Sequence, residues 1–207
     1  MAKTIDYYYS TRSNFTYLGA ARLNALAKTH GRTIVHRPIL LSVTMPPIGG
    51  LPFGERPTML RHYAMNDALR CAAHLGVPVL REPIHHEGPV ELPSGIVIAG
   101  QRAVGRGEAG DIDLLSLLVL QALWRDDRDI ADAAVVAELC AEAGYADPKA
   151  LLAEALSTAV QAELARNCRE AIMRGVIGAP SYFVDGENFY GQDRLDYVER
   201  ALARDTG

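Results

Sequence analysis

The chain of 207 residues is 49% hydrophobic and 22% charged, and its formal net charge at pH 7 is −4. A chain of this length can bury a substantial core, either as one domain with an insertion or as two small domains. The acidic balance and the absence of a basic run argue against nucleic acid or an anionic membrane as a partner. Charges interrupt the longest apolar stretches well before they reach the length of a membrane span.

Three cysteines, Cys71, Cys140 and Cys168, are widely spaced along the chain. An odd number at wide spacing is typical of free thiols in a reducing compartment and not of a disulfide framework. The first residues run straight into an apolar segment, without the charged, apolar and small-residue regions of a signal peptide. These features predict a cytoplasmic protein.

The first forty residues carry the pattern of a strand–helix–strand unit. Residues 5–9 are β-branched and aromatic, which indicates a strand, and the polar cluster at 10–14 is rich in helix-capping residues. An amphipathic helical pattern follows and ends at His30-Gly31, after which residues 33–41 are typical of a second strand. Such a unit normally places its two strands in parallel.

The middle of the chain changes to helical patterns. It opens with a loop rich in proline and glycine at 46–54. Asp132 is positioned to cap one helix, Pro148 to start the next, and Ser157-Thr158 to restart a helix that would otherwise be too long. The helical patterns cover residues 58–75, 94–106, 112–124, 132–143 and 148–174.

The last part of the chain returns to strands. Residues 182–184 and 188–190 flank the turn pair Asp185-Gly186, which predicts a hairpin. Asp193 then opens a final amphipathic helix. The order is therefore β-α-β, a helical middle, and α-β-β-α.

Ser13 and Pro180 are the residues with the clearest chemical interest. Ser13 precedes a helix, where its hydroxyl either caps the helix or donates a hydrogen bond to an anionic sulfur supplied by a ligand. Pro180 precedes a strand, where a trans turn is the ordinary arrangement and a cis bond would turn the backbone of Ala179 outward. Composition alone favours the helix cap and the trans turn.

Three segments together resemble a known family. The stretch from Ser13 to Leu18, the stretch from Gly175 to Pro180, and Gly191-Gln192-Asp193-Arg194 occur in the order and spacing of the 2-hydroxychromene-2-carboxylate isomerases. That family is grouped with kappa-class glutathione transferases in the thioredoxin-like superfamily, which also contains disulfide oxidoreductases of the DsbA type. The similarity extends over nearly the whole chain, including residues 67–70 and 122–124.

The resemblance implies an α/β fold in which a thioredoxin-like domain is split by an inserted all-helical domain. The discontinuous domain would comprise residues 1–45 and 160–207, and the helical insertion residues 46–159. It also implies that the protein binds glutathione as a cofactor. Ser13 would face the glutathione sulfur, the residue before a cis-proline would pair with the cysteinyl part, and the start of the last helix would hold the γ-glutamyl end. The implied cofactor-binding residues are Ser13, Ala179, Pro180, Gly191, Gln192, Asp193 and Arg194.

The resemblance further implies an enzyme with Ser13 as its catalytic residue, which isomerises an aromatic pyruvate-like carboxylate in aromatic catabolism, and a homodimer. Thr16 stands at the second redox position, so the chain has no cysteine pair there for disulfide exchange. Arg12 or Arg37 is expected to meet the substrate carboxylate. His85-His86 is expected to have a structural or pocket role and not to bind metal.

Two alternatives stay open at this point. A kappa-like glutathione transferase or peroxidase would consume glutathione, whereas an isomerase would regenerate it. A non-catalytic protein with a thioredoxin-like groove would hold an extended peptide or a small acid without turning it over.

Overall fold

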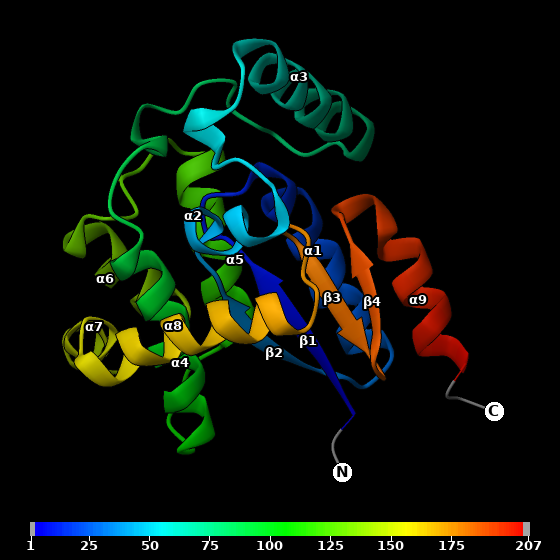
Figure 1. The fold of residues 1–207 in the computed structure, drawn as a ribbon. Helices are drawn as coiled ribbons and strands as arrows, with labels where there is room; N and C mark the ends of the chain where they lie inside the picture. Colours follow the sequence, from blue (N-terminus) through cyan, green and yellow to red (C-terminus); the bar gives the residue numbers. More distant parts are fainter. Residues whose placement is uncertain (1–2, 205–207) are drawn as a thin grey trace.

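We describe residues 3–204 of a computed structural model, which is built around one mixed four-stranded sheet (Figure 1). Its strand order is β2-β1-β3-β4. Strand β1 pairs in parallel with β2 and antiparallel with β3, and β3 pairs antiparallel with β4. The strands are β1 Thr4–Tyr9, β2 Thr33–Pro38, β3 Ser181–Val184 and β4 Glu187–Tyr190.

Helices cover both faces of this sheet. Side chains alternate between the two faces along β1, and apolar side chains on each face pack against helices. Tyr7 and Tyr9 stack at 4.2 Å between ring centroids and belong to the main core with residues of helices α1 and α5. Tyr8 points to the other face and packs with Cys168 of helix α8. The helices are α1 Asn14–Thr29, α2 Leu41–Thr44, α3 Thr58–Leu75, α4 Glu91–Gly105, α5 Ile112–Trp124, α6 Ala133–Glu142, α7 Pro148–Ala155, α8 Thr158–Met173 and α9 Leu195–Ala203.

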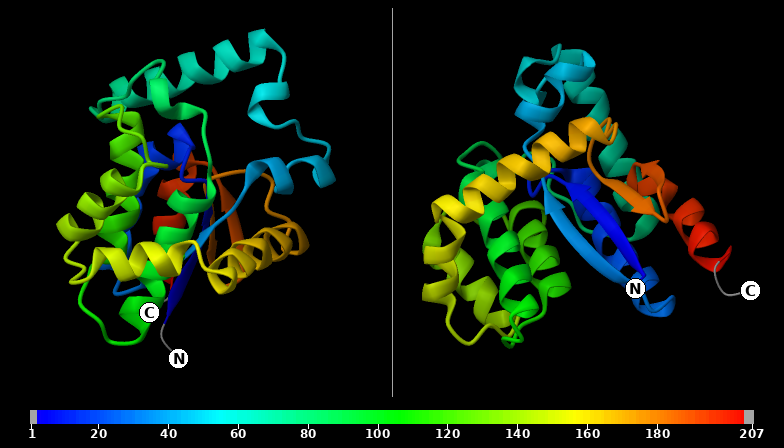
Figure 2. Two further views of the ribbon diagram at one scale, coloured as in Figure 1. Left: turned by 90° about the vertical axis from the view of Figure 1, so that its left-hand side faces the viewer. Right: turned by 60° about the horizontal axis from the view of Figure 1, so that its bottom comes forward.

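The chain order confirms the predicted α/β architecture with a helical middle. Helix α1 links the parallel strands β1 and β2, and helices α3 to α7 all lie between β2 and α8 in sequence. Figure 2 shows α8 leading from these helices back across the sheet, while α9 lies beside β4 on the other side. No helix within residues 3–204 is long and apolar enough to cross a membrane.

The division into two domains stays a prediction. The boundary placed between residues 159 and 160 falls in the first turn of α8, which begins at Thr158. The core is also continuous, since apolar side chains of α4 and α5 pack in one cluster with Tyr7 and Tyr9 of the sheet. The helical segment is therefore joined to the sheet by shared packing.

Three element boundaries differ from the predicted ones. Strand β2 ends at Pro38, which has no N–H to continue a ladder, and the residues up to Leu41 pass into the short helix α2. Helix α4 begins at Glu91 and not at Ser94, because Pro93 lies in the first turn, where the missing N–H needs no partner. The last helix begins at Leu195, since residues Gln192–Arg194 form a separate 3-10 turn.

Strand β2 is an edge strand, and α4 covers its free edge. The Gln101 side chain accepts a hydrogen bond from the backbone N–H of His36 at 2.7 Å and donates one to the carbonyl of the same residue at 3.2 Å. One amide thus satisfies two backbone groups that an uncovered edge would leave unpaired. This contact fixes the helical segment to the strand.

A buried polar chain continues this junction into α5. The Tyr9 hydroxyl lies 2.7 Å from Ser116 Oγ and 3.1 Å from His36 Nδ1, and His36 Nε2 lies 2.8 Å from Asp113 Oδ1. Ser116 and Asp113 belong to α5, whereas Tyr9 and His36 belong to neighbouring strands. Buried polar groups with specific partners hold one arrangement of the elements.

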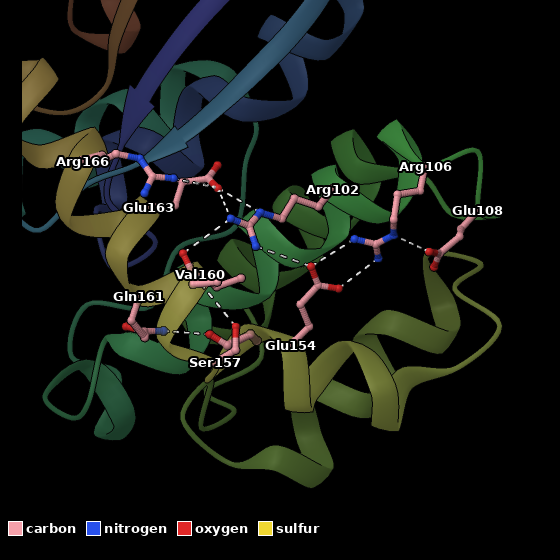
Figure 3. A network of polar contacts seen from close by, with 11 residues as sticks. Arg102, Arg106, Glu108, Glu154, Ser157, Val160, Gln161, Glu163 and Arg166 are labelled. Carbon is pink, nitrogen blue, oxygen red and sulfur yellow. Dashed lines mark hydrogen bonds and ion pairs between the residues drawn. The ribbon is translucent and has the colours of Figure 1, made fainter.

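Helices α4, α7 and α8 are joined by partly buried ion pairs, drawn in Figure 3. Arg102 of α4 contacts Glu163 of α8 at 2.6 Å, and Arg106 contacts Glu154 of α7 at 2.9 Å. The close approach of α4 to α7 requires glycine at position 95, where an added Cβ would lie 2.3 Å from the Ala155 carbonyl oxygen. The predicted helix restart is confirmed, because Ser157 Oγ accepts from the backbone N–H of Val160.

We expect Gln101→Ala to lower the free energy of unfolding by about 2 kcal/mol, because two backbone groups of His36 lose their partners. Urea unfolding followed by circular dichroism measures the change. Gln121→Ala is the matched control, because no side-chain hydrogen bond of Gln121 is found within residues 3–204, and it should stay within about 0.5 kcal/mol of the wild type. Equal losses in both variants would contradict this role of Gln101.

Candidate active site

A cavity of about 310 Å³ opens where the sheet, the start of α1 and the helical segment meet. Ser13 at the start of α1 and Ala179 before β3 both line it, so the structure brings together two predicted site residues that are far apart in sequence. Trp124 at the end of α5 and His86 from the loop before α4 complete the wall on the helical side. Junctions of this kind are common ligand sites.

Ser13 caps α1, as the composition suggested, and also faces the cavity. Its backbone is extended, and its Oγ accepts a hydrogen bond from the backbone N–H of Thr16 at 3.2 Å. This bond uses a lone pair, so the hydroxyl proton stays available for donation into the cavity. Asn14 serves the next backbone group, since its Oδ1 accepts from the N–H of Phe15 at 2.8 Å.

Thr16 and the three cysteines do not line the cavity. Thr16 is fully buried one turn into α1, and its hydroxyl has no hydrogen-bond partner among the described residues. All three cysteines are free, and burial raises the pKa of Cys71 and Cys168 and raises that of Cys140 to about 12. The site therefore has no reactive thiol of its own.

Ala179 reaches the cavity through the turn that precedes β3. Its bond to Pro180 is cis, which composition alone did not favour and the family resemblance implied. The neighbouring Gly178 lines the same wall, where an added Cβ would lie 2.6 Å from the ring of Tyr190. Only glycine allows the turn to pack this closely against β4.

The segment Gly191 to Arg194 lies behind this turn and does not line the cavity. The backbone N–H of Gly191 donates to the Pro180 carbonyl at 2.9 Å, which ties the segment to the turn. Gln192 is buried, with a side-chain oxygen that has no partner among the described residues. Asp193 and Arg194 are exposed and pair with each other at 2.8 Å. The structure thus places these four residues next to Ala179-Pro180 but outside the cavity itself.

Arg12 holds the loop that carries His86. Its guanidinium donates to the carbonyl oxygens of His85, His86 and Pro89. Gly88 lies beside it, and an added Cβ there would come within 2.9 Å of the Arg12 terminal nitrogen, so the guanidinium would have to shift. The two terminal nitrogens of Arg12 therefore donate to backbone groups and hold the loop that carries His86, while the buried Nε of Arg12 has no partner among the described residues.

His86 lies between two aromatic rings at this wall. Its ring centroid is 5.1 Å from that of Trp124 and 5.7 Å from that of Phe53. Burial lowers the pKa of His86, and the nearby Arg12 charge lowers it further, so the imidazole is neutral at pH 7. Within residues 3–204 no group of three or more histidine, cysteine or acidic side chains is arranged to hold a metal ion.

The cavity is electrostatically one-sided. Arg12 and Arg56 line it, and none of its described lining residues is acidic. Arg56 donates through Nε to the Leu51 carbonyl at 3.0 Å. No ion pair between Arg56 and a carboxylate is found in the described part of the chain. Arg37, in contrast, lies outside the cavity and pairs with Asp6 and Glu170. Two cations were expected to meet a substrate carboxylate. Arg37 does not line the cavity, and the terminal nitrogens of Arg12 are already hydrogen-bonded to backbone carbonyls.

Several lining residues were not singled out from the sequence. Phe53 belongs to the loop rich in proline and glycine and Arg56 follows it closely, and the sequence pattern does not define the path of this segment. The sequence pattern predicts strand positions for three further lining residues, Leu40, Leu41 and Tyr190. Leu40 and Leu41 reach the cavity because strand β2 already ends at Pro38. No local signal marks such residues, because distant contacts decide which of them face the cavity.

Comparisons with known proteins agree with this arrangement. A 2-hydroxychromene-2-carboxylate isomerase from Sphingobium xenophagum is 31% identical over 208 residues, which cover 98% of this chain and 99% of that protein. The enzyme of the same name from Pseudomonas putida is 27% identical over 201 residues, covering 97% and 94% of the two chains.

The solved structures lead to the same fold. That of a 2-hydroxychromene-2-carboxylate isomerase has a TM-score of 0.76 at 25% identity and covers 97% of this chain and 95% of its own. The cytosolic disulfide reductase DsbM from Pseudomonas aeruginosa has a TM-score of 0.68 at 21% identity over 97% and 96%, which shows the fold alone. The family model of the DSBA-like thioredoxin domain matches residues 4–203. The chain therefore belongs to the DsbA-like thioredoxin family.

Proposed function

We propose that this protein is a glutathione-dependent isomerase of the 2-hydroxychromene-2-carboxylate type, acting in aromatic catabolism. The observation that carries the proposal is the Ser13 hydroxyl, which caps α1 and faces a cavity with two arginines and no acidic lining residue among those described. Similarity over almost the full length of enzymes with this name supports the reaction class.

The residues at the site fit glutathione, which is an anionic thiol. The Ser13 hydroxyl proton is available to donate a hydrogen bond, and Arg56 has no carboxylate partner among the described residues. None of the three cysteines lines the cavity. A solved structure of DsbM with GSH, which has a TM-score of 0.69 at 20% identity to this chain, supports the proposal. When bound, glutathione would supply a thiolate that adds reversibly to a conjugated carbon of the substrate and turns a double bond into a rotatable single bond.

The chain's own groups would stabilise the charged form of that sulfur. Ser13 donates a hydrogen bond to it, and the N-terminal end of α1 contributes a positive potential. The backbone of Ala179, which also lines the cavity, would pair with the cysteinyl part. Gly191, Gln192, Asp193 and Arg194, next to Pro180, would meet the γ-glutamyl end, where Asp193 accepts from the ammonium group.

The opposite wall would accept the aromatic substrate. Trp124 and Phe53 flank His86 and offer apolar faces for a ring. Arg56 is the cation best placed to meet the substrate carboxylate, since Arg12 is bound to three carbonyl groups and Arg37 lies elsewhere. The aromatic and cationic groups therefore match the two ends of an aromatic keto acid.

Quaternary structure and location stay predictions. The exposed apolar side chains of Met59, Leu60 and Tyr63 lie on α3, with Ile84 exposed in the following loop, and would suit the predicted homodimer. The cytoplasmic location continues to depend on the free cysteines.

We expect the protein to isomerise 2-hydroxychromene-2-carboxylate only when glutathione is present, and to leave the glutathione concentration unchanged. Absorbance of the substrate and a thiol assay on the same samples measure both quantities. Stoichiometric loss of glutathione with an electrophile or a hydroperoxide, without isomerisation, would instead establish a transferase or peroxidase. No binding of glutathione by calorimetry would favour the non-catalytic binding protein.

We expect Ser13→Ala to lower kcat about ten- to a thousandfold, because one preorganised donor to the developing charge is lost. Loss of the helix cap should also cost about 1 kcal/mol of stability. Ser157→Ala is the matched control, since Ser157 caps α8 in the same way, at 3.3 Å from the Val160 nitrogen, but lies outside the cavity. It should lose similar stability and keep its kcat. Unchanged turnover in Ser13→Ala would refute the role of Ser13.

A further inference from the structure

His86 lines the cavity, and the proposed thiolate chemistry gives it no role. It lies on the wall shared by the cavity described above and a second cavity of about 590 Å³ between α3 and residues 81–87. Phe53 is the other residue common to both cavities. One ring nitrogen of His86 hydrogen-bonds to the backbone of Arg12, and the Arg12 guanidinium donates to the His86 backbone carbonyl. No second partner of the ring is found within residues 3–204, so Arg12 holds the ring in place and its other nitrogen is left to accept a proton.

His86 is also the sole described residue lining the first cavity whose side chain ordinarily titrates near neutral pH. The other ionisable side chains there belong to two arginines and one tyrosine, Arg12, Arg56 and Tyr190. The groups facing His86 from the second cavity are Arg61, His62, Arg81, Glu82 and Glu87. Burial and Arg12 keep the imidazole neutral, so that it can accept a proton at pH 7.

The substrate class requires such a group. A 2-hydroxychromene-2-carboxylate is a cyclic hemiketal, and its double bond can rotate only after the ring has opened. Opening removes the proton of the hemiketal hydroxyl, forms the carbonyl as the ring C–O bond breaks, and leaves the electron pair on the phenolic oxygen. The phenolic oxygen then takes up a proton, so the step moves one proton between two oxygens and needs no other reactant.

We propose that His86 transfers this proton: its neutral imidazole accepts it from the hemiketal hydroxyl and, as imidazolium, returns it to the phenolic oxygen. The inference rests on the proposed function and assigns to His86 a step that is separate from the thiolate chemistry at Ser13. The rings of Phe53 and Trp124 pack against the imidazole at 78° and 58° to its plane, and Arg12 holds its backbone. His86 is then a catalytic residue for ring opening alone.

Two substrates separate this role from a structural one. The first is 2-hydroxychromene-2-carboxylate, and the second is the cis form of a benzylidene keto acid without the ring hydroxyl, which cannot form a hemiketal. We expect His86→Gln to lower kcat about a hundredfold or more on the first substrate and less than about threefold on the second. His86→Phe, which keeps the aromatic wall, should show the same split, and imidazole in the buffer should restore part of the rate of both variants.

The pH dependence gives a further readout. The wild-type rate of ring opening should fall as His86 becomes protonated, at a pH below its ordinary pKa of about 6.5, and this fall should be absent in His86→Gln. His85→Gln is the control, because the neighbouring His85 does not line the cavity. It should behave as the wild type on both substrates.

The outcomes are distinguishable from failure of the proposed function. Glutathione binding by calorimetry should be unchanged in His86→Gln, and the wild type should turn over the ring-free substrate only with glutathione. If both substrates are slowed equally in His86→Gln, or if His86→Phe keeps full activity on the hemiketal, His86 is a wall residue and the inference is wrong. If the wild type turns over neither substrate, the proposed function fails and the inference falls with it.

Discussion

Two hydrogen bonds between the Gln101 side chain and the backbone of His36 join the helical segment to the sheet. The cavity depends on that junction, because its lining residues come from both parts of the chain. Gln101 closes the free edge of β2, and the Tyr9–Ser116–His36–Asp113 chain extends the contact from the strands into α5. Because Trp124 lies at the end of α5, fixing this helix against the sheet also fixes the wall opposite Ser13. The cavity therefore requires that the sheet and the helical segment keep this arrangement relative to each other.

The cavity combines a hydrogen-bond donor, a cationic lining and no reactive thiol. In a relative that performs disulfide exchange, a cysteine of the chain would supply the sulfur chemistry at the start of α1. Here Ser13 stands at the start of α1 and Thr16 is buried in its first turn, so the proposed sulfur chemistry would use a sulfur supplied by a ligand. The same helix N-terminus that would activate a cysteine can stabilise a thiolate that is bound and not covalently attached to the chain. Under the proposed function, serine at this position changes the class of reaction while the fold is kept.

Much of the fold could be predicted from local sequence signals, whereas the shape of the site could not. The polar caps at Asp132 and Ser157 were predicted, and each accepts a backbone hydrogen bond at the start of its helix. Ser13 and Ala179 were found through their motifs and do line the cavity. Phe53, Arg56 and the exclusion of Arg37 could not be predicted, because they depend on the path of an irregular loop and on the early end of β2. The geometry also places Gly191 to Arg194 beside the Ala179-Pro180 turn and outside the cavity lining, which a linear motif cannot show.

The central claim is that Ser13 stabilises the sulfur of a bound glutathione. A crystal structure of the protein grown with glutathione tests it most directly. The account predicts the glutathione sulfur within hydrogen-bond distance of Ser13 Oγ, about 3.5 Å or less, with the cysteinyl part beside the backbone of Ala179. Glutathione bound with its sulfur directed away from Ser13, or in the second cavity between α3 and residues 81–87, would contradict the account.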